Sequence, residues 1–273
     1  MRLSRSMHST QTVDLLFEVA SLNDQGIEMA EQRRYHDALA VFQEGLSLAL
    51  RYGFDLHVLW ITRNIARTYK HMGDYESAIA YYRKSLSLAE PGSIERCHIH
   101  TGMALSLLEL GSYRKALSHF TAAYRISNRL GDTRGIADCL TNLGLAFCKA
   151  GYLEKARELM ELALTHYFSI GYLEGLAYSY TELAKISCGQ GQIARGLHYA
   201  REAMMLAADL KDDLELARAL VASAMLYRKK GNENKSRSYL RQAYSIFSAY
   251  QDPAGLAECL SLMHKNEGRF KER

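Results

Sequence analysis

The sequence has little proline or cysteine, and each shortage excludes a class of protein. Two prolines occur in 273 residues, which suits uninterrupted helices because proline lacks an N–H donor and clashes with the preceding turn. The five cysteines are odd in number and have neither the spacing of a disulfide framework nor that of a zinc site. We therefore expect free thiols in a reducing cytoplasm and no bound metal.

Long apolar runs and catalytic motifs are also missing. No stretch approaches the roughly 20 apolar residues of a membrane helix, and residues 1–12 are polar, unlike a signal peptide. The net charge of +4 is too small to indicate a nucleic-acid partner by itself. No glycine-rich phosphate loop, serine elbow or paired-carboxylate cleft is visible. We expect a cytoplasmic, non-catalytic protein without a cofactor, a membrane partner or a nucleic-acid partner.

The pattern that is present is clearest in residues 131–170, where two segments of helical periodicity are joined by Ala150-Gly151-Tyr152. Small and apolar residues recur there at spacings of three, four and seven, as one face of an amphipathic helix requires. They are Leu140, Leu143, Gly144 and Phe147 in the first segment, and Ala156, Met160, Ala163 and Tyr167 in the second. One such hairpin buries too little surface to be stable alone, so it needs stacked copies of itself.

Copies are present, in phase with a small residue of the second segment. This marker stands at Ala38, Ala78, Ala116, Ala156, Gly196 and Ser236, with successive spacings of 40, 38, 40, 40 and 40 residues. Glycine or alanine always stands twelve places before it. The fifth copy is unusual, because Gly196 and Ala200 replace the usual alanine and large apolar residue. We expect either a local bend or tighter packing in that copy.

Two motifs link these copies to a known family. Gly73-Asp74-Tyr75-x-x-Ala78-x-x-x-Tyr82 resembles the second half of a tetratricopeptide repeat, and Leu143-Gly144-x-x-Phe147 resembles the first half. The period near 40 is similar to that of a long-repeat subset with G-protein signalling modulators, kinesin light chains and Rap-type regulators. The resemblance implies an all-α, right-handed superhelical solenoid of six helix-turn-helix repeats with a C-terminal capping helix.

The expected organisation is a single solenoid domain over residues 13–266, because no composition shift marks a linker. Residues 1–12 are expected to be disordered, and residues 267–273 to form a charged tail. The six repeats are placed at residues 13–50, 57–90, 93–129, 133–170, 173–209 and 213–249, and the capping helix at 253–266.

The resemblance also implies a binding surface, because in this family one stripe of each first helix lines an inner groove. In this chain the stripe is rich in lysine and arginine, which would attract an acidic segment or a terminal carboxylate. Trp60, Arg63, Asn64 and Arg67 form its densest part. The candidate groove residues are Trp60, Arg63, Asn64, Arg67, Lys70, Thr101, Asn142, Lys149, Tyr178, Lys185, Arg218 and Arg228.

Two functions and one plainer interpretation follow from this stripe. A protein-interaction scaffold would hold an extended or helical, acidic segment of a partner in the groove. A peptide-responsive cytosolic regulator, similar to the Rap type but without a DNA-binding domain, would change the pitch of the array on binding. In the plainer interpretation the charges are a solvated helix face and Trp60 is a packing residue. We expect the scaffold.

Overall fold

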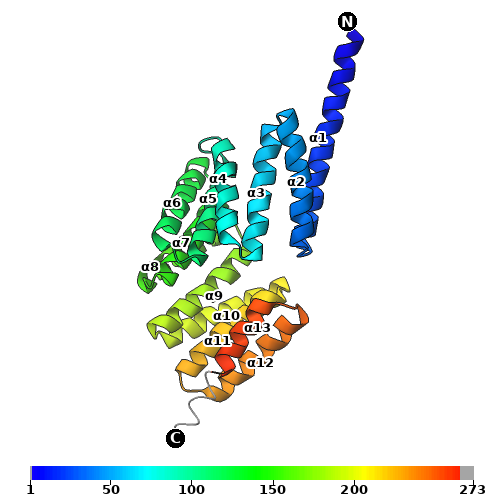
Figure 1. Ribbon diagram of the computed structural model, residues 1–273. Helices are drawn as coiled ribbons and strands as arrows, with labels where there is room; N and C mark the ends of the chain where they lie inside the picture. The colour runs from blue at the N-terminus through cyan, green and yellow to red at the C-terminus, as the bar shows by residue number, and fades with distance from the viewer. Residues whose placement is uncertain (1, 265–273) are drawn as a thin grey trace. The chain divides into compact units, whose positions relative to one another are not determined.

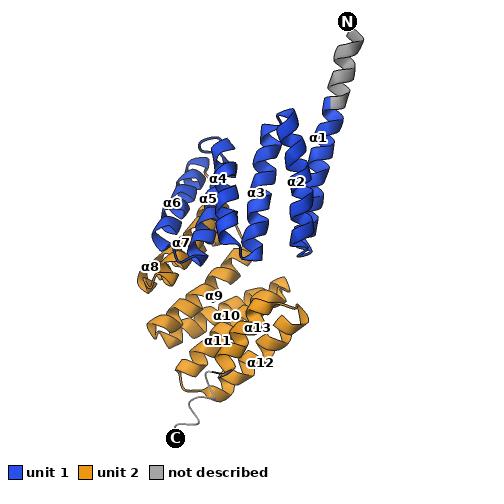
Figure 2. Cartoon of the chain, viewed as in Figure 1, with its two compact units in different colours: residues 1–130 blue, residues 131–273 orange. Residues whose placement is uncertain are grey.

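All regular structure in the part of the chain that the computed structural model describes, residues 2–264, is α-helical, which confirms the all-α prediction (Figure 1). None of these helices combines the length and the apolar composition that crossing a membrane demands. The chain divides into two compact units, Met1–Leu130 (unit 1) and Gly131–Arg273 (unit 2) (Figure 2). One continuous array over residues 13–266 stays a prediction.

Unit 1 consists of three helical hairpins, in which α1 packs on α2, α3 on α4, and α5 on α6. The helices are α1 (Arg2–Glu31), α2 (Tyr35–Tyr52), α3 (Asp55–Met72), α4 (Tyr75–Leu88), α5 (Ile94–Glu109) and α6 (Tyr113–Leu130). Consecutive hairpins touch through the contacts of α2 with α3 and of α4 with α5. Each hairpin therefore covers apolar surface that its neighbour leaves open.

Unit 2 repeats this arrangement and adds one helix, α13, which packs on α11 and α12. Its helices are α7 (Thr133–Lys149), α8 (Leu153–Ser169), α9 (Leu173–Gln190), α10 (Ile193–Leu210), α11 (Asp213–Lys229), α12 (Glu233–Ala249) and α13 (Pro253–His264). Cys259 and Leu262 of α13 are buried in the same cluster as Leu240 and Phe247 of α12. α13 thus covers apolar surface of the last hairpin.

The small marker residues explain how each hairpin closes. All six are buried, and the four alanines among them have no exposed surface. The side chain four places later fills the space beside the marker, and Phe42, Phe120 and Met160 are each at most 1% exposed. A small residue against a large one lets two helices approach closely without leaving a void.

The first helix of a repeat is covered on more sides than the second. α3 touches α1, α2, α4 and α5, whereas α4 touches α3 and α5. Most of the surface of α3 is consequently buried, and what stays open is a narrow stripe along its length. Function at this part of the chain depends on which residues occupy that stripe.

The turns between helices follow local rules. Gly73 ends α3 with a φ of 84°, a left-handed conformation that glycine adopts without steric cost. Asp74 then caps α4, because its carboxylate accepts a hydrogen bond from the Ser77 N–H at 3.0 Å. Asp132 caps α7 in the same way through the Gly135 N–H at 2.9 Å.

α1 differs from the expectation at its start. We predicted disorder over residues 1–12 and a helix from Val13, whereas α1 begins at Arg2. The physical reason is that residues 2–25 contain no glycine or proline, the two residues that disfavour a helix most. At the other end, residues 265–273, which include the expected charged tail, lie outside the described residues.

The fifth copy closes by tight packing against Gly196. α10 runs uninterrupted through Gly196 and Ala200. Leu226 of α11 fills the available space, and a Cβ at residue 196 would overlap its side chain. Leu226 is fully buried in a cluster with Ala184, Ala200 and Ala222.

Candidate functional site

Five large side chains follow one another along the open stripe of α3. We call Leu56, Trp60, Arg63, Arg67 and Lys70 the α3 stripe. Their spacings of three and four residues place them on one face of the helix. The first two are apolar and the last three are cationic, so the stripe changes character along its length.

The three cations of the α3 stripe line a hollow of about 430 Å³ in unit 1, which we call the cationic hollow. Helices α4 and α5 supply the rest of its wall. The lining residues are Arg63, Arg67, Lys70, Tyr82, His98, Thr101, Gly102 and Leu105. The structure thereby brings together four predicted groove residues from α3 and α5.

Arg67 also lines a second hollow, of about 360 Å³, on the side of α1 and α2. Its other lining residues are Ala30, Glu31, Arg33, Tyr35 and His71. Tyr35 and His71 stack there with ring centroids 6.4 Å apart. The exposed Arg67 side chain therefore stands between two hollows and is available to a ligand in either one.

The cations of the hollow lack ion-pair partners in the part of the chain that the structure describes. Among the described residues, no ion pair or hydrogen bond joins Arg63, Arg67 or Lys70 to a carboxylate. Burial lowers the pKa of Arg63 and of Lys70, and the charge of Arg67 lowers both further. Glu95 and the phenol of Tyr82 act to raise the pKa of Arg63, but burial and Arg67 outweigh them. Such a cluster is stabilised by an incoming anion.

Tyr82 belongs to the hollow although sequence reasoning assigned it to packing alone. Its side chain is 3% exposed, and its hydroxyl has no hydrogen-bond partner among the described residues. Burial raises its pKa to about 12, partly opposed by Arg67 and Arg63, so the phenol stays neutral and can donate. The available signal was a tyrosine at a position where the neighbouring copies carry Phe42 and Phe120.

Gly102 makes room for that tyrosine. A Cβ at residue 102 would overlap Cζ and Oη of Tyr82. The equivalent positions in the second and fourth copies hold Asn64 and Asn142. The glycine and the tyrosine are thus a matched pair that shapes the floor of the hollow.

Three predicted residues of unit 1 have structural partners. Asn64 is 3% exposed, and its Nδ2 donates to Oδ1 of Asn23 on α1 at 2.8 Å, so it ties two repeats together. Thr101 lines the hollow while its hydroxyl donates to the carbonyl of Cys97 at 3.1 Å. Trp60 is 36% exposed, and its ring lies edge-on against His57.

In unit 2 three of the predicted cations are paired with an acid or a carbonyl. Lys185 Nζ lies 2.9 Å from Glu182, and Arg218 Nη1 lies 3.1 Å from Glu215. Burial acts to lower the pKa of Lys185, but Glu182 and other carboxylates outweigh it and raise the pKa. Arg228 donates to the carbonyl of Leu262 at 3.3 Å. The predicted stripe did not include these acids, which lie three residues before their partners, so its charges looked unpaired.

Glu215 anchors a buried network between α9 and α11. It is 4% exposed, and its Oε1 accepts a hydrogen bond from the hydroxyl of Thr181 at 2.6 Å. Burial raises its pKa. Burial also raises the pKa of the half-buried Tyr178. Of the other predicted residues on this unit, Asn142 is half-buried on α7 and Lys149 is exposed at its end.

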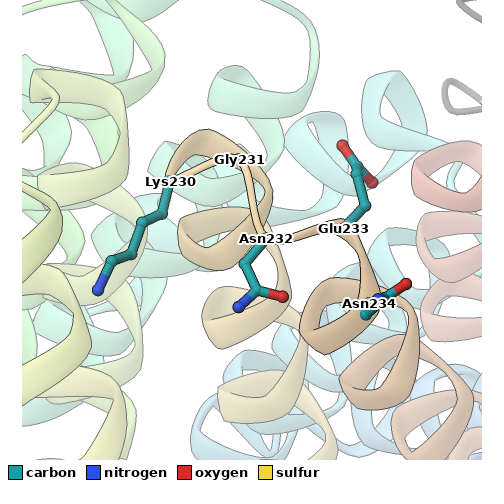
Figure 3. Close-up of a pocket in the computed structure, with 5 residues that line it drawn as sticks. All are labelled: Lys230, Gly231, Asn232, Glu233 and Asn234. Atoms are coloured by element: carbon teal, nitrogen blue, oxygen red, sulfur yellow. The ribbon is translucent and has the colours of Figure 1, made fainter.

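A further depression, of about 370 Å³, lies at the turn between α11 and α12, lined by Lys230, Gly231, Asn232, Glu233 and Asn234 (Figure 3). The labelled side chains point away from one another. Asn232 caps α12, because its Oδ1 accepts from the Lys235 N–H at 3.1 Å. This surface is a turn without converging groups, and it is a weaker candidate than the cationic hollow.

One histidine pair lies outside the hollow, between α5 and α6. The Nδ1 atoms of His100 and His119 are 2.9 Å apart, so one ring must donate and the other accept. Burial, together with His119 and Arg96, lowers the pKa of His100 to about 4, and burial with Arg83 lowers that of His119. Among the described side chains, no group of three or more His, Cys, Asp or Glu is placed to hold a metal.

The pair predicts a loss of stability in mild acid. Both pKa values lie below the ordinary value of 6.5, so the unfolded chain takes up protons first as the pH falls. The contribution of the neutral pair is present above pH 6.5 and is lost toward pH 4. With His100→Phe and His119→Phe combined, we expect the fall in unfolding free energy to shrink by about 1 kcal/mol, allowing for solvent screening. Urea unfolding at several pH values measures this. The exposed His36→Gln is the control, and parallel wild-type and double-variant profiles would contradict the prediction.

Comparisons with known proteins agree with this architecture. A family model described as "Tetratricopeptide repeat" matches residues 19–90 and 95–167, and another of the same description matches residues 217–250. Tetratricopeptide repeat protein 29 of Homo sapiens is 25% identical over 138 residues, covering 50% of this chain but 29% of that protein. The matched region is thus less than a third of that relative.

Two solved structures are similar in fold. Aspartyl phosphate phosphatase F from Bacillus subtilis has a TM-score of 0.71 and 18% identity, covering 88% of this chain and 73% of the other. A Rap protein complexed with competence and sporulation factor has a TM-score of 0.69 and 15% identity, covering 99% and 80%. Together with the family matches, these likenesses confirm the predicted resemblance to helical repeat proteins.

Proposed function

We propose that this chain, which belongs to the tetratricopeptide repeat family, is a non-catalytic scaffold that binds an acidic segment of another protein at the cationic hollow of unit 1. The observation that carries the proposal is the convergence of Arg63, Arg67 and Lys70 on one hollow, where no carboxylate of residues 12–264 is paired to them. Helical repeats of this family mediate protein–protein interaction, and the forked guanidinium donors of arginine suit carboxylates.

The choice of unit 1 rests on what the cations already contact. Forming a new pair with Lys185 or Arg218 would require a ligand to compete with Glu182 or Glu215, which are at hand. At the cationic hollow an acidic ligand meets no carboxylate of the described residues that is already paired to the cations. An acidic ligand therefore gains more at unit 1, although both units contribute cations to the predicted stripe.

The experiment compares two double charge reversals in affinity capture from a lysate of the native organism. Arg63→Glu with Arg67→Glu is expected to weaken capture of the partner by about 30-fold, because two favourable charges become repulsive. The matched control is Arg237→Glu with Arg241→Glu, which makes the same change at the same spacing on exposed positions of α12. Circular dichroism checks that both variants stay helical. Full capture by the Arg63/Arg67 variant would show that the hollow is not the binding site.

A peptide-responsive regulator is the second candidate. It is favoured by the likeness to a Rap protein that was solved with a bound factor. Small-angle scattering separates the two functions, since a regulator should change its radius of gyration when a short acidic peptide is added. A scaffold should bind the same peptide with an unchanged radius.

A further inference from the structure

The apolar end of the α3 stripe is exposed, like Arg67 at its cationic end. Leu56 is 65% exposed and Trp60 is 36% exposed, although both are large apolar side chains. They lie one turn apart on the same helical face as Arg63 and Arg67. Within unit 1, an open apolar surface therefore continues directly into the cationic hollow.

Trp60 is held in place from one side. His57 contacts it edge-on at a centroid distance of 5.3 Å, and Phe54 in turn contacts His57 at 6.0 Å. Tyr52 stacks on Phe54 at 6.0 Å. Because this row of rings restrains the indole, little conformational entropy is lost when a ligand packs on its open part.

The hollow at the other end combines charged donors with a neutral one. The Tyr82 hydroxyl has no hydrogen-bond partner in the described part of the chain, and Tyr82 lines the same space as Arg63, Arg67 and Lys70. Donors of both kinds around one space fit the oxygens of a carboxylate, which accepts several hydrogen bonds at once. The acidic feature of the ligand is thus recognised by hydrogen-bond geometry as well as by charge.

We infer that the α3 stripe recognises two features of one extended partner segment: an acidic side chain in the cationic hollow and an apolar side chain against Leu56 and Trp60. This inference rests on the proposed function and specifies its partner. The two contacts follow from the continuity of the apolar and cationic ends on one helix face. The cationic end alone would bind any acidic peptide, and the apolar end alone would bind any apolar peptide.

The helix sets the distance between the two features. Trp60 and Arg67 are seven residues apart, which corresponds to about 10 Å along an α-helix. A peptide in the extended polyproline II conformation advances about 3.1 Å per residue and presents every third side chain on the same face. The acidic and the apolar residue of the partner are therefore expected about three positions apart.

Peptides of equal length test the spacing. One carries leucine three positions from a pair of glutamates, in either order, in an otherwise Gly/Ser sequence. A second has serine in place of leucine, and a third has leucine directly beside the glutamates. Labelled peptides give the affinity by anisotropy. Trp60, the single tryptophan of the chain, reports burial of its indole by a shift of its emission to shorter wavelength.

We expect the better order of the leucine peptide to bind about tenfold tighter than the serine peptide, as partial burial of one leucine side chain predicts. Only that peptide should shift the emission of Trp60. The adjacent-leucine peptide should bind like the serine peptide. Equal affinity of all three would overturn the inference yet leave the proposed function intact, whereas no binding by any of them would count against both.

Variants of the chain separate the two contacts. Leu56→Ser and Trp60→Ala should each lower the affinity for the leucine peptide toward that for the serine peptide. The affinity for the serine peptide should not change. Tyr82→Phe should weaken the binding of both peptides by the same factor, about fivefold, because it removes one hydrogen bond to the acidic side chain. Leu162→Ala, at a 45% exposed residue of α8, is the control. An emission shift that follows protein concentration without peptide would assign the apolar end to a second copy of the chain and overturn the inference.

Discussion

Phe120→Ala is expected to lower the free energy of unfolding by about 4 kcal/mol. Phe120 has no exposed surface and stands on α6 four residues after the marker Ala116. Alanine at this position removes a ring that fills the space between two helices, and the surrounding repeat can collapse only partly onto the cavity. The loss is large because the cost of the cavity adds to the lost transfer free energy.

Urea unfolding followed by Trp60 emission measures this effect, since Trp60 and Phe120 belong to the same unit. Phe17→Ala is the matched control in the same unit, because Phe17 is 70% exposed on α1. The control should change stability by less than about 0.5 kcal/mol. A loss at Phe120 no larger than that of the control would mean that the residue after the marker does not hold the repeats together.

Gly102→Ala is expected to cost about 2 kcal/mol of unfolding free energy, although alanine is the better helix former. The added methyl group would overlap the buried ring of Tyr82. The ring must move, and the cationic hollow loses its floor at the same time. Acidic peptides should therefore bind more weakly to the variant even under conditions where it stays folded.

Two further variants show whether the steric contact is the cause. Combining Gly102→Ala with Tyr82→Leu should recover most of the stability, because the shorter side chain leaves room for the methyl group. Gly189→Ala on α9 is the control. Its Cβ meets only the flexible Leu153 side chain, so higher helix propensity should make it neutral or stabilising. Additive losses in the double variant would contradict the explanation.

The ion pairs of the predicted stripe could have been predicted from the sequence. Lys185 and Arg218 each have an acid three residues earlier, and the structure pairs them with it. Arg63 and Arg67 have no acid three or four residues away on α3. A test of these local spacings would have separated the paired cations from the unpaired ones, because ion pairs on a helix form between residues one turn apart.

Other features of the site have no such local signal. Asn64 is removed from the open surface by Asn23, a residue 41 positions away. Tyr82 becomes a lining residue because Gly102, on the next repeat, leaves its ring the space. In each case the partner lies on a neighbouring helix, and the sequence around the residue does not identify it.

The sequence by itself determined that the chain is helical, that a marker recurs about every 40 residues, and that one face of α3 is apolar and then basic. These properties depend on spacings within a helix and on small residues at its contacts, which are local. Only the tertiary structure decided that Asn64 is buried, which tyrosine lines the cationic hollow and which leucine fills the fifth copy. The reason is that each repeat is completed by side chains from the next one, and their fit depends on the packed shape of both.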